Sequence, residues 1–148
     1  MSESQIPNIC AGGRVAAHMT TREIRLVLTV ENLDRTVAFF RDVLGLPQIA
    51  AFENDGGHAV LLDAGHATLE LFDETQAAAI DEIEVGRRVA GPVRIAFQVE
   101  DSDAVARTLA AAGAEVIGGP VATPWGDRNV RLVGPDAIQL TLFSPVTS

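Results

Sequence analysis

The chain has 148 residues, of which 47% are hydrophobic and 21% charged, as in one globular domain or two small halves that share a core. Its net charge of −9 and isoelectric point near 4.6 would repel nucleic acids and anionic membranes, so we expect neither as a partner. No apolar run approaches the roughly 20 residues that span a bilayer. The lone Cys10 supports neither a disulfide framework nor a cysteine-rich zinc motif. Without a signal-peptide pattern, we expect a cytoplasmic protein.

The N-terminal extension, residues 1–22, lacks sustained periodicity, and we assign it no function. Its pair His18–Met19 resembles a cloning junction, and the sequence leaves open whether the natural chain starts at Met19 or upstream of it. We expect residues 23–148 to form a single domain.

The first half of that domain has the pattern strand, helix and three strands. Alternation from Ile24 to Val30 predicts a strand. Asp34 opens a helix whose apolar face is Val37, Phe40 and Leu44, and Gly45 ends it. Three further strands are expected at Pro47 to about Glu53, His58 to Leu62 and His66 to Phe72, with turns at Asn54–Gly57 and Asp63–Gly65.

The second half repeats the first at a spacing of 69 residues. RLVLTVENLD (25–34) matches RIAFQVEDSD (94–103), and TLEL (68–71) matches AIQL (137–140). The expected second-half elements are a strand at Val93–Val99, a helix at Asp103–Ala112 and strands near Glu115–Ile117, Asn129–Val133 and Ala137–Phe143. We therefore predict an α+β fold of two βαβββ modules (about 23–74 and 92–144, with a linker at about 75–91), whose curled mixed sheets surround a shared concave cavity.

The strand alternation gives each sheet two unlike faces. Leu26, Leu28 and Val30 are expected on the helix side. The opposite face carries a mixed set: Arg25, His66, Glu70, Phe72, Arg94, Gln139 and Phe143. Antiparallel sheets often leave one such face to water. The repeat instead favours a concavity shared by both modules, which is the usual setting of a ligand site.

Two such units, the helix motif NLDRTVAFFRDVLG and the TrpGlyAsp stretch at 125–127 resemble the vicinal oxygen chelate superfamily. That superfamily includes glyoxalase I, extradiol dioxygenases, fosfomycin-resistance enzymes and bleomycin-resistance proteins. The resemblance covers Ile24 to Phe143. It implies the fold more firmly than any one reaction, because this fold hosts several chemistries.

In metal-using members, the resemblance places the ligand positions at Arg25, Glu70, Arg94 and Gln139. Arginine has no lone pair to donate and remains cationic, so two of the four positions would repel a divalent ion. We expect no metal and no cofactor.

The sequence leaves two roles open for the paired arginines. Arg25 and Arg94 can neutralise Glu70 in a buried ionic cluster, because an isolated buried charge is costly. Alternatively, two arginines against one glutamate leave positive charge for an anionic ligand group. The arginines also favour the ionised form of Glu70, which makes it a poor general base.

Other candidate residues are aromatic or titratable. Trp125 can stack a planar ligand beside Phe72 and Phe143, or it can simply cover the end of the barrel. His66, and less so His58, can take part in acid–base chemistry, although strand histidines are often surface residues.

The function that we expect is metal-free binding of an anionic or planar hydrophobic small molecule, similar to the bleomycin-resistance type. The alternative is an enzyme of the lyase, isomerase or dioxygenase class that uses Glu70 or His66; a metal-dependent version is disfavoured. We also expect a homodimer with twofold symmetry, since the sheets have edges to protect.

Overall fold

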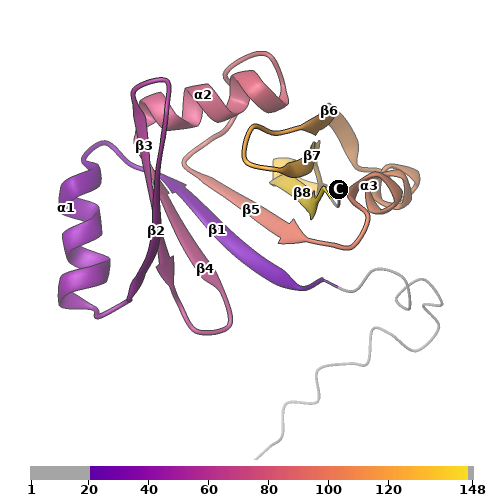
Figure 1. Cartoon of the computed structure of the whole chain (residues 1–148). Helices are drawn as coiled ribbons and strands as arrows, with labels where there is room; N and C mark the ends of the chain where they lie inside the picture. Colours follow the sequence, from indigo (N-terminus) through magenta and orange to yellow (C-terminus); the bar gives the residue numbers. More distant parts are fainter. Residues whose placement is uncertain (1–20, 147–148) are drawn as a thin grey trace, which may run out of the picture.

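The computed structural model describes residues 21–146; the extension up to Thr20, including His18–Met19, lies outside the described residues. Two βαβββ modules follow one another in the chain, as predicted (Figure 1). The elements of the first module are β1 (Glu23–Thr29), α1 (Leu33–Val37), the π-helix η2 (Ala38–Val43), β2 (Gln48–Asn54), β3 (Gly57–Asp63) and β4 (Thr68–Phe72). The second module contains β5 (Val93–Gln98), α3 (Ser102–Ala111), β6 (Glu115–Ala122), β7 (Asp127–Val133), the 3-10 helix η3 (Pro135–Ala137) and β8 (Gln139–Pro145). Within the described part of the chain, no helix is both long and apolar enough to cross a membrane.

The eight strands found among residues 21–146 form one curled mixed sheet in the order β2-β3-β4-β1-β5-β8-β7-β6. Each module pairs its first and last strands in parallel, β1 with β4 and β5 with β8. The antiparallel pairing of β1 with β5 joins the modules side by side. The α+β class and the curled mixed sheet are therefore confirmed, with β2 and β6 as the two edges.

The helix starts preserve the 69-residue spacing of the repeat. Asn32 and Asp101 are N-caps 69 residues apart, and each side chain accepts a hydrogen bond from the backbone N–H three residues later. Such caps satisfy donors that the first helical turn cannot pair internally and typically stabilise a helix by about 1 kcal/mol. The helix begins at Leu33, so the predicted start at Asp34 is one residue late.

The convex side holds one apolar core per module. Val37 packs with Leu62, Leu69 and Leu71, with Phe40 at the margin. In the second module the core under α3 consists of Val99, Val105, Ala106, Val130, Leu132 and Leu142. These contacts follow from the period-two alternation of the strands and the apolar stripe of each helix.

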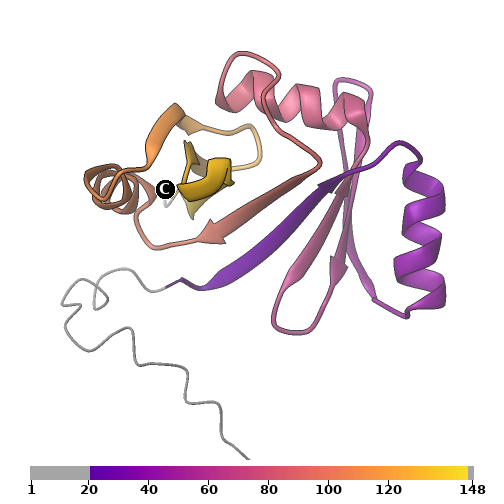
Figure 2. The ribbon, with the colours of Figure 1, turned by 180° about the vertical axis from the view of Figure 1, so that it is seen from behind.

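Two predicted core positions are exposed instead. Leu44 is 61% exposed, because the helix continues in π form, in which Leu44 N–H bonds to the Phe39 carbonyl five residues back. Leu26 is 39% exposed, because β1 and β5 lie at the middle of the sheet while α1 packs on β4 and α3 on β6, β7 and β8. Figure 2 shows α1 and α3 at opposite ends of the molecule.

The predicted linker contains a helix that sequence reasoning did not assign, α2 (Glu74–Glu84). Asp73 caps it by accepting from the Gln76 N–H, and Gly86, at φ +83°, follows its end. α2 spans the two modules in both views (Figures 1 and 2). Two close approaches hold it there: a Cβ at Gly57 would lie 2.2 Å from Gln76 N, and one at Gly118 would lie 2.2 Å from Glu84 O.

α2 also creates a third core, on the concave side of the sheet. Its Ala77 and Ile80 pack with a cluster contributed by both modules: Val27, Ala59, Leu61, Phe72, Ala96 and Phe143. Burying an isoleucine side chain contributes roughly 1.5–3 kcal/mol. The concave face is therefore partly filled from the linker rather than left open to water.

Candidate ligand-binding site

A cavity of about 230 Å³ lies on the concave face, between the sheet and α2. Both modules contribute to its wall. Its lining comes from the inner strands of the sheet (Arg25, Glu70, Phe72, Arg94, Ala96, Asn129, Thr141, Phe143), from α2 (Gln76, Ile80, Glu84) and from the two hairpins (Phe52, Glu53, Asn54, Ala59, Leu61, Pro124, Trp125, Asp127). The shared concavity that the repeat suggested is thus present.

The strand register changes which residues of the two modules correspond. Leu26 on β1 pairs with Leu69, whereas its counterpart Ile95 on β5 pairs with Leu140. The spacing is therefore 69 residues between β1 and β5 but 71 between β4 and β8. Glu70 consequently corresponds to Thr141, not to Gln139.

Arg25 is neutralised by carboxylates. Its Nη1 lies 3.1 Å from Glu70 Oε1 and its Nη2 lies 3.1 Å from Glu23 Oε2. Its guanidinium carbon stands 4.8 Å from the centre of the Phe143 ring. Burial opposes its charge, but Glu70 and Glu23 outweigh burial and raise the pKa of Arg25.

Arg94 has the same position in the second module but no direct ion pair among the described residues, and the charges of Glu84, Glu70 and Asp81 act on it only from beyond ion-pair distance. It is 6% exposed, and its Nη1 donates to Thr141 Oγ1 over 2.6 Å. Its guanidinium carbon lies 5.9 Å from the Phe72 ring centre, mirroring the Arg25 stack. Among residues 21–146, no carboxylate lies within ion-pair distance of it, and its Nε has no hydrogen-bond partner. Burial accordingly lowers the pKa of Arg94, although a guanidinium stays protonated.

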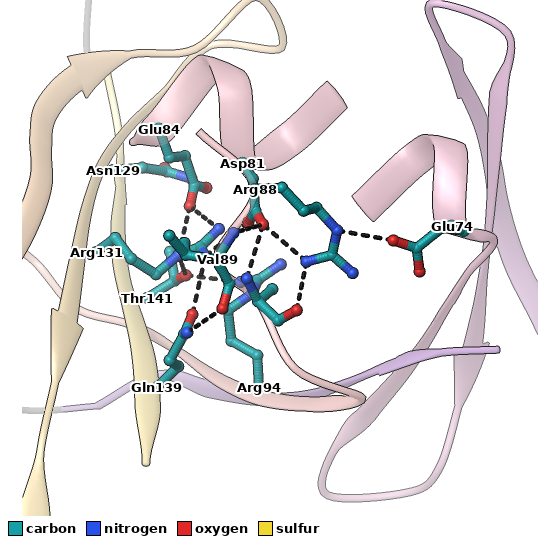
Figure 3. A network of polar contacts seen from close by, with 11 residues as sticks. Glu74, Asp81, Glu84, Arg88, Val89, Arg94, Asn129, Arg131, Gln139 and Thr141 are labelled. Atoms are coloured by element: carbon teal, nitrogen blue, oxygen red, sulfur yellow. Dashed lines mark hydrogen bonds and ion pairs between the residues drawn. The ribbon is translucent and has the colours of Figure 1, made fainter. Parts of the chain in front are cut away.

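A third arginine, Arg131, is fully buried, and sequence reasoning missed it. Its Nη1 donates to Asp81 Oδ1 over 2.8 Å, and its Nε donates to Glu84 Oε2 over 2.8 Å. Figure 3 shows it between these two carboxylates of α2, with Arg94 nearby. Asp81 also accepts from Arg88 Nη1. Burial alone would raise the pKa of Asp81, but backbone N–H groups of residues 89 and 90 and the Arg131 guanidinium hold it below its usual value.

Two predicted site residues lie outside the cavity lining. Gln139 donates through Nε2 to the Val89 carbonyl over 2.6 Å and accepts from Arg131 Nη1 over 3.2 Å, so its amide belongs to the α2 network. His66 is exposed in the turn between β3 and β4, and His58 is exposed on β3. The other predicted residues do come together: Arg25, Glu70, Phe72, Arg94, Trp125 and Phe143 all line the cavity.

Trp125 stands at the cavity rim, where it is 41% exposed. It sits in the turn before β7, which Thr123 closes by donating from its backbone N–H to the Asp127 carbonyl over 2.8 Å. Burial raises the pKa of the neighbouring Asp127 carboxyl, against the opposing effects of Arg25 and of a hydrogen bond from Trp125.

The central residues do not suit a divalent metal. Two of the four corresponding positions are the cations Arg25 and Arg94, the third is the hydroxyl of Thr141, and Glu70 is held in an ion pair. In the described part of the chain, no group of three or more His, Cys, Asp and Glu side chains could hold a metal ion.

The chain matches known proteins over most of its length. The sequence pattern of the Glyoxalase/Bleomycin resistance protein/Dioxygenase superfamily matches residues 18–142. An uncharacterized protein of Mycolicibacterium smegmatis is 32% identical over 103 residues, which are 69% of this chain and 77% of that protein. The chain therefore belongs to this superfamily, and the resemblance seen in the sequence is confirmed.

Solved structures share the fold. Methylmalonyl-CoA epimerase from Mycobacterium tuberculosis superposes with a TM-score of 0.64 at 20% identity, covering 89% of this chain and 92% of its own. Methylmalonyl-CoA epimerase from Streptomyces coelicolor, in complex with 2-nitronate-propionyl-CoA, gives 0.61 at 24% identity, covering 87% and 99%. At these identities the likeness establishes the fold and leaves the chemistry to the residues of the cavity.

Proposed function

We propose that this protein is a metal-free small-molecule binder that holds a compact organic anion in the concave cavity. One observation carries the proposal: Arg94 is a buried cation without a carboxylate partner, whereas its counterpart Arg25 has two. In the first module Glu70 supplies the negative charge, and in the second module Thr141 offers only a hydroxyl. A ligand carboxylate would fill that gap.

Thr141 can assist in holding the anion. Its oxygen already accepts from Arg94 Nη1 and from Arg131 Nε, at 2.6 and 3.1 Å. Its own hydroxyl proton is therefore left to donate. Arg94 and Thr141 together offer charge-assisted donors to one anionic group.

The volume and the apolar lining of the cavity limit the size and the chemistry of the rest of the ligand. A volume of about 230 Å³ is below the roughly 300–1,000 Å³ of sites for drug-sized ligands, which favours a small ligand or the end of a larger one. Phe72, Phe143 and Ile80 offer apolar contact, with Trp125 at the rim. A flat aryl or short alkyl acid fits this description.

Binding is better supported than proton transfer through the residues first considered. Glu70 is engaged by Arg25, and His66 lies outside the cavity lining. The epimerase from S. coelicolor, which holds an acyl-CoA analogue, supports the idea that this fold accommodates organic acids and their derivatives.

The proposal is tested by titrating 3-phenylpropanoate and its uncharged amide, 3-phenylpropanamide, by calorimetry. We expect the acid to bind and the amide to bind far more weakly. Arg94→Met keeps the side-chain length but removes the charge, and it should weaken the acid by about 10- to 150-fold, equivalent to the 1.5–3 kcal/mol of a charged hydrogen bond.

The matched control is Arg107→Met, which removes one positive charge from the exposed surface of α3. Its affinity for the acid should equal that of the wild type. Equal losses in both variants would mean that only net charge matters, and unchanged binding in Arg94→Met would overturn the proposal.

A further inference from the structure

Four buried side-chain nitrogen and oxygen atoms of the described residues have no hydrogen-bond partner: Arg25 Nε, Arg94 Nε, Gln76 Oε1 and Asn129 Oδ1. All four residues line the cavity. A buried polar atom left unsatisfied costs roughly 1–3 kcal/mol, so their concentration around one cavity points to a ligand that pairs them. Two are donors on the sheet, and two are acceptors.

The orientation of the Asn129 side-chain amide is fixed by its hydrogen bond to Glu84. Its Nδ2 donates to Glu84 Oε1 over 2.7 Å, and an ionised carboxylate can only accept, so the amide cannot be turned around. The other oxygen of Glu84 is taken by Arg131. Asn129 Oδ1 is therefore left without a partner, in a residue that is 5% exposed.

The Gln76 acceptor is set up by α2 and the β2–β3 hairpin. Its Nε2 donates to Asn54 Oδ1 over 2.8 Å, and the residue is 2% exposed. Its position on the first turn of α2 is fixed by the Asp73 cap. Gln76 on α2 and Asn129 on β7 thus each present a neutral acceptor, while the unpaired arginine donors lie on β1 and β5.

We infer that the ligand is a hydroxy- or amido-substituted organic acid, whose hydroxyl or N–H group donates to Gln76 Oε1 or Asn129 Oδ1 while its anionic group lies at Arg94. This inference rests on the proposed function and adds the second recognition group. Neutral amide oxygens suit a neutral donor, and the carboxylate bonded to Asn129, Glu84, is already paired with Arg131. A ligand with only an anion would leave both acceptors unsatisfied.

The test compares 3-phenylpropanoate with its 2-, 3- and 4-hydroxyphenyl analogues and with the corresponding methyl ethers. In the wild-type protein at least one phenol should bind about 3- to 10-fold more tightly than the parent acid, the range of a net hydrogen bond. Its methyl ether, which cannot donate, should show no such gain.

Gln76→Met and Asn129→Ser, made singly, locate the acceptor. One of them should abolish the phenol's advantage, measured as the ratio of the affinities of the phenol and the parent acid in the same variant. Glu82→Met, on the exposed face of the same helix, is the control and should keep the advantage.

The outcomes separate the two proposals. If no acid binds in an Arg94-dependent way, the proposed function fails. If acids bind through Arg94 but none of the phenols gains over the parent acid, or if the gain survives both variants, the inference about the donor group is overturned while the proposed function stands.

Discussion

Arg94 and Arg131 are both buried arginines, but they differ in the partners that surround their charge. Arg131 has a carboxylate on either side, Asp81 and Glu84. Arg94 has only the hydroxyl of Thr141. A buried charge with good partners is tolerated, and one without them is costly, so Arg131 is expected to stabilise the fold and Arg94 to weaken it in favour of binding.

Methionine substitutions should reveal the difference in ligand-free protein. Arg131→Met leaves the buried Glu84 without an ion pair and Asp81 with Arg88 as its remaining one, and it should lower the free energy of unfolding by about 3–5 kcal/mol. Arg94→Met removes an unpaired charge and should raise it by on the order of 1 kcal/mol. Urea denaturation checks both, and a large loss in Arg94→Met would show that this arginine balances the acidic cluster structurally.

The sequence predicted that Arg25 and Arg94 hold equivalent positions, but it did not predict which residues they contact. The 69-residue repeat correctly made Arg25 and Arg94 equivalent. It misaligned the last strands, because β8 is displaced by two residues relative to β4, and only the strand register shows that Thr141 takes the position of Glu70. Arg131 gave no signal, since an arginine on a strand usually faces water.

At the scale of elements, α2 decides the shape of the site. It turns an open concave sheet into a covered cavity, and it brings Gln76, Asp81 and Glu84 to the lining or just behind it. The sequence did carry its start signal, Asp73 followed three residues later by Gln76, and its stop signal, Gly86. The buried face of α2 includes two carboxylates, which hid the helix from a search for apolar periodicity.

The close packing of α2 against the sheet can be tested with glycine substitutions. Gly118→Ala places a Cβ within 2.2 Å of Glu84 O, so the helix must shift, and we expect lower stability and weaker acid binding. Gly91→Ala is the matched control, because a Cβ there meets nothing within 4 Å. Reduced conformational freedom of the unfolded chain should leave that variant as stable as the wild type or slightly more so.

Thermal unfolding and calorimetric titration of both variants give the result. If Gly118→Ala matches Gly91→Ala in stability and affinity, the close contact between Gly118 and the Glu84 carbonyl is contradicted.

At the scale of the whole molecule, the two modules make one cavity within a single chain, yet the sheet keeps two edges. β2 and β6 end the strand order, and Ile49 and Phe52 of β2 are 57% and 48% exposed. Apolar side chains on an unpaired edge favour association. We therefore propose the C2 homodimer that the sequence suggested.

Light scattering at micromolar concentration tests the assembly. We predict a mass of twice the 15.6 kDa of one chain. A mass of one chain across the micromolar range would contradict the dimer and leave the cavity proposal intact, since all lining residues come from one chain.

The most direct test of anion binding at Arg94 is a crystal structure with 4-bromobenzoate, in which the bromine is located by anomalous scattering. We predict that the carboxylate lies within about 3 Å of the Arg94 guanidinium and Thr141 Oγ1, with the bromine directed at the apolar wall formed by Phe72, Phe143 and Ile80. A carboxylate bound away from Arg94, or an Arg94 guanidinium paired with a carboxylate of the protein itself, would contradict it.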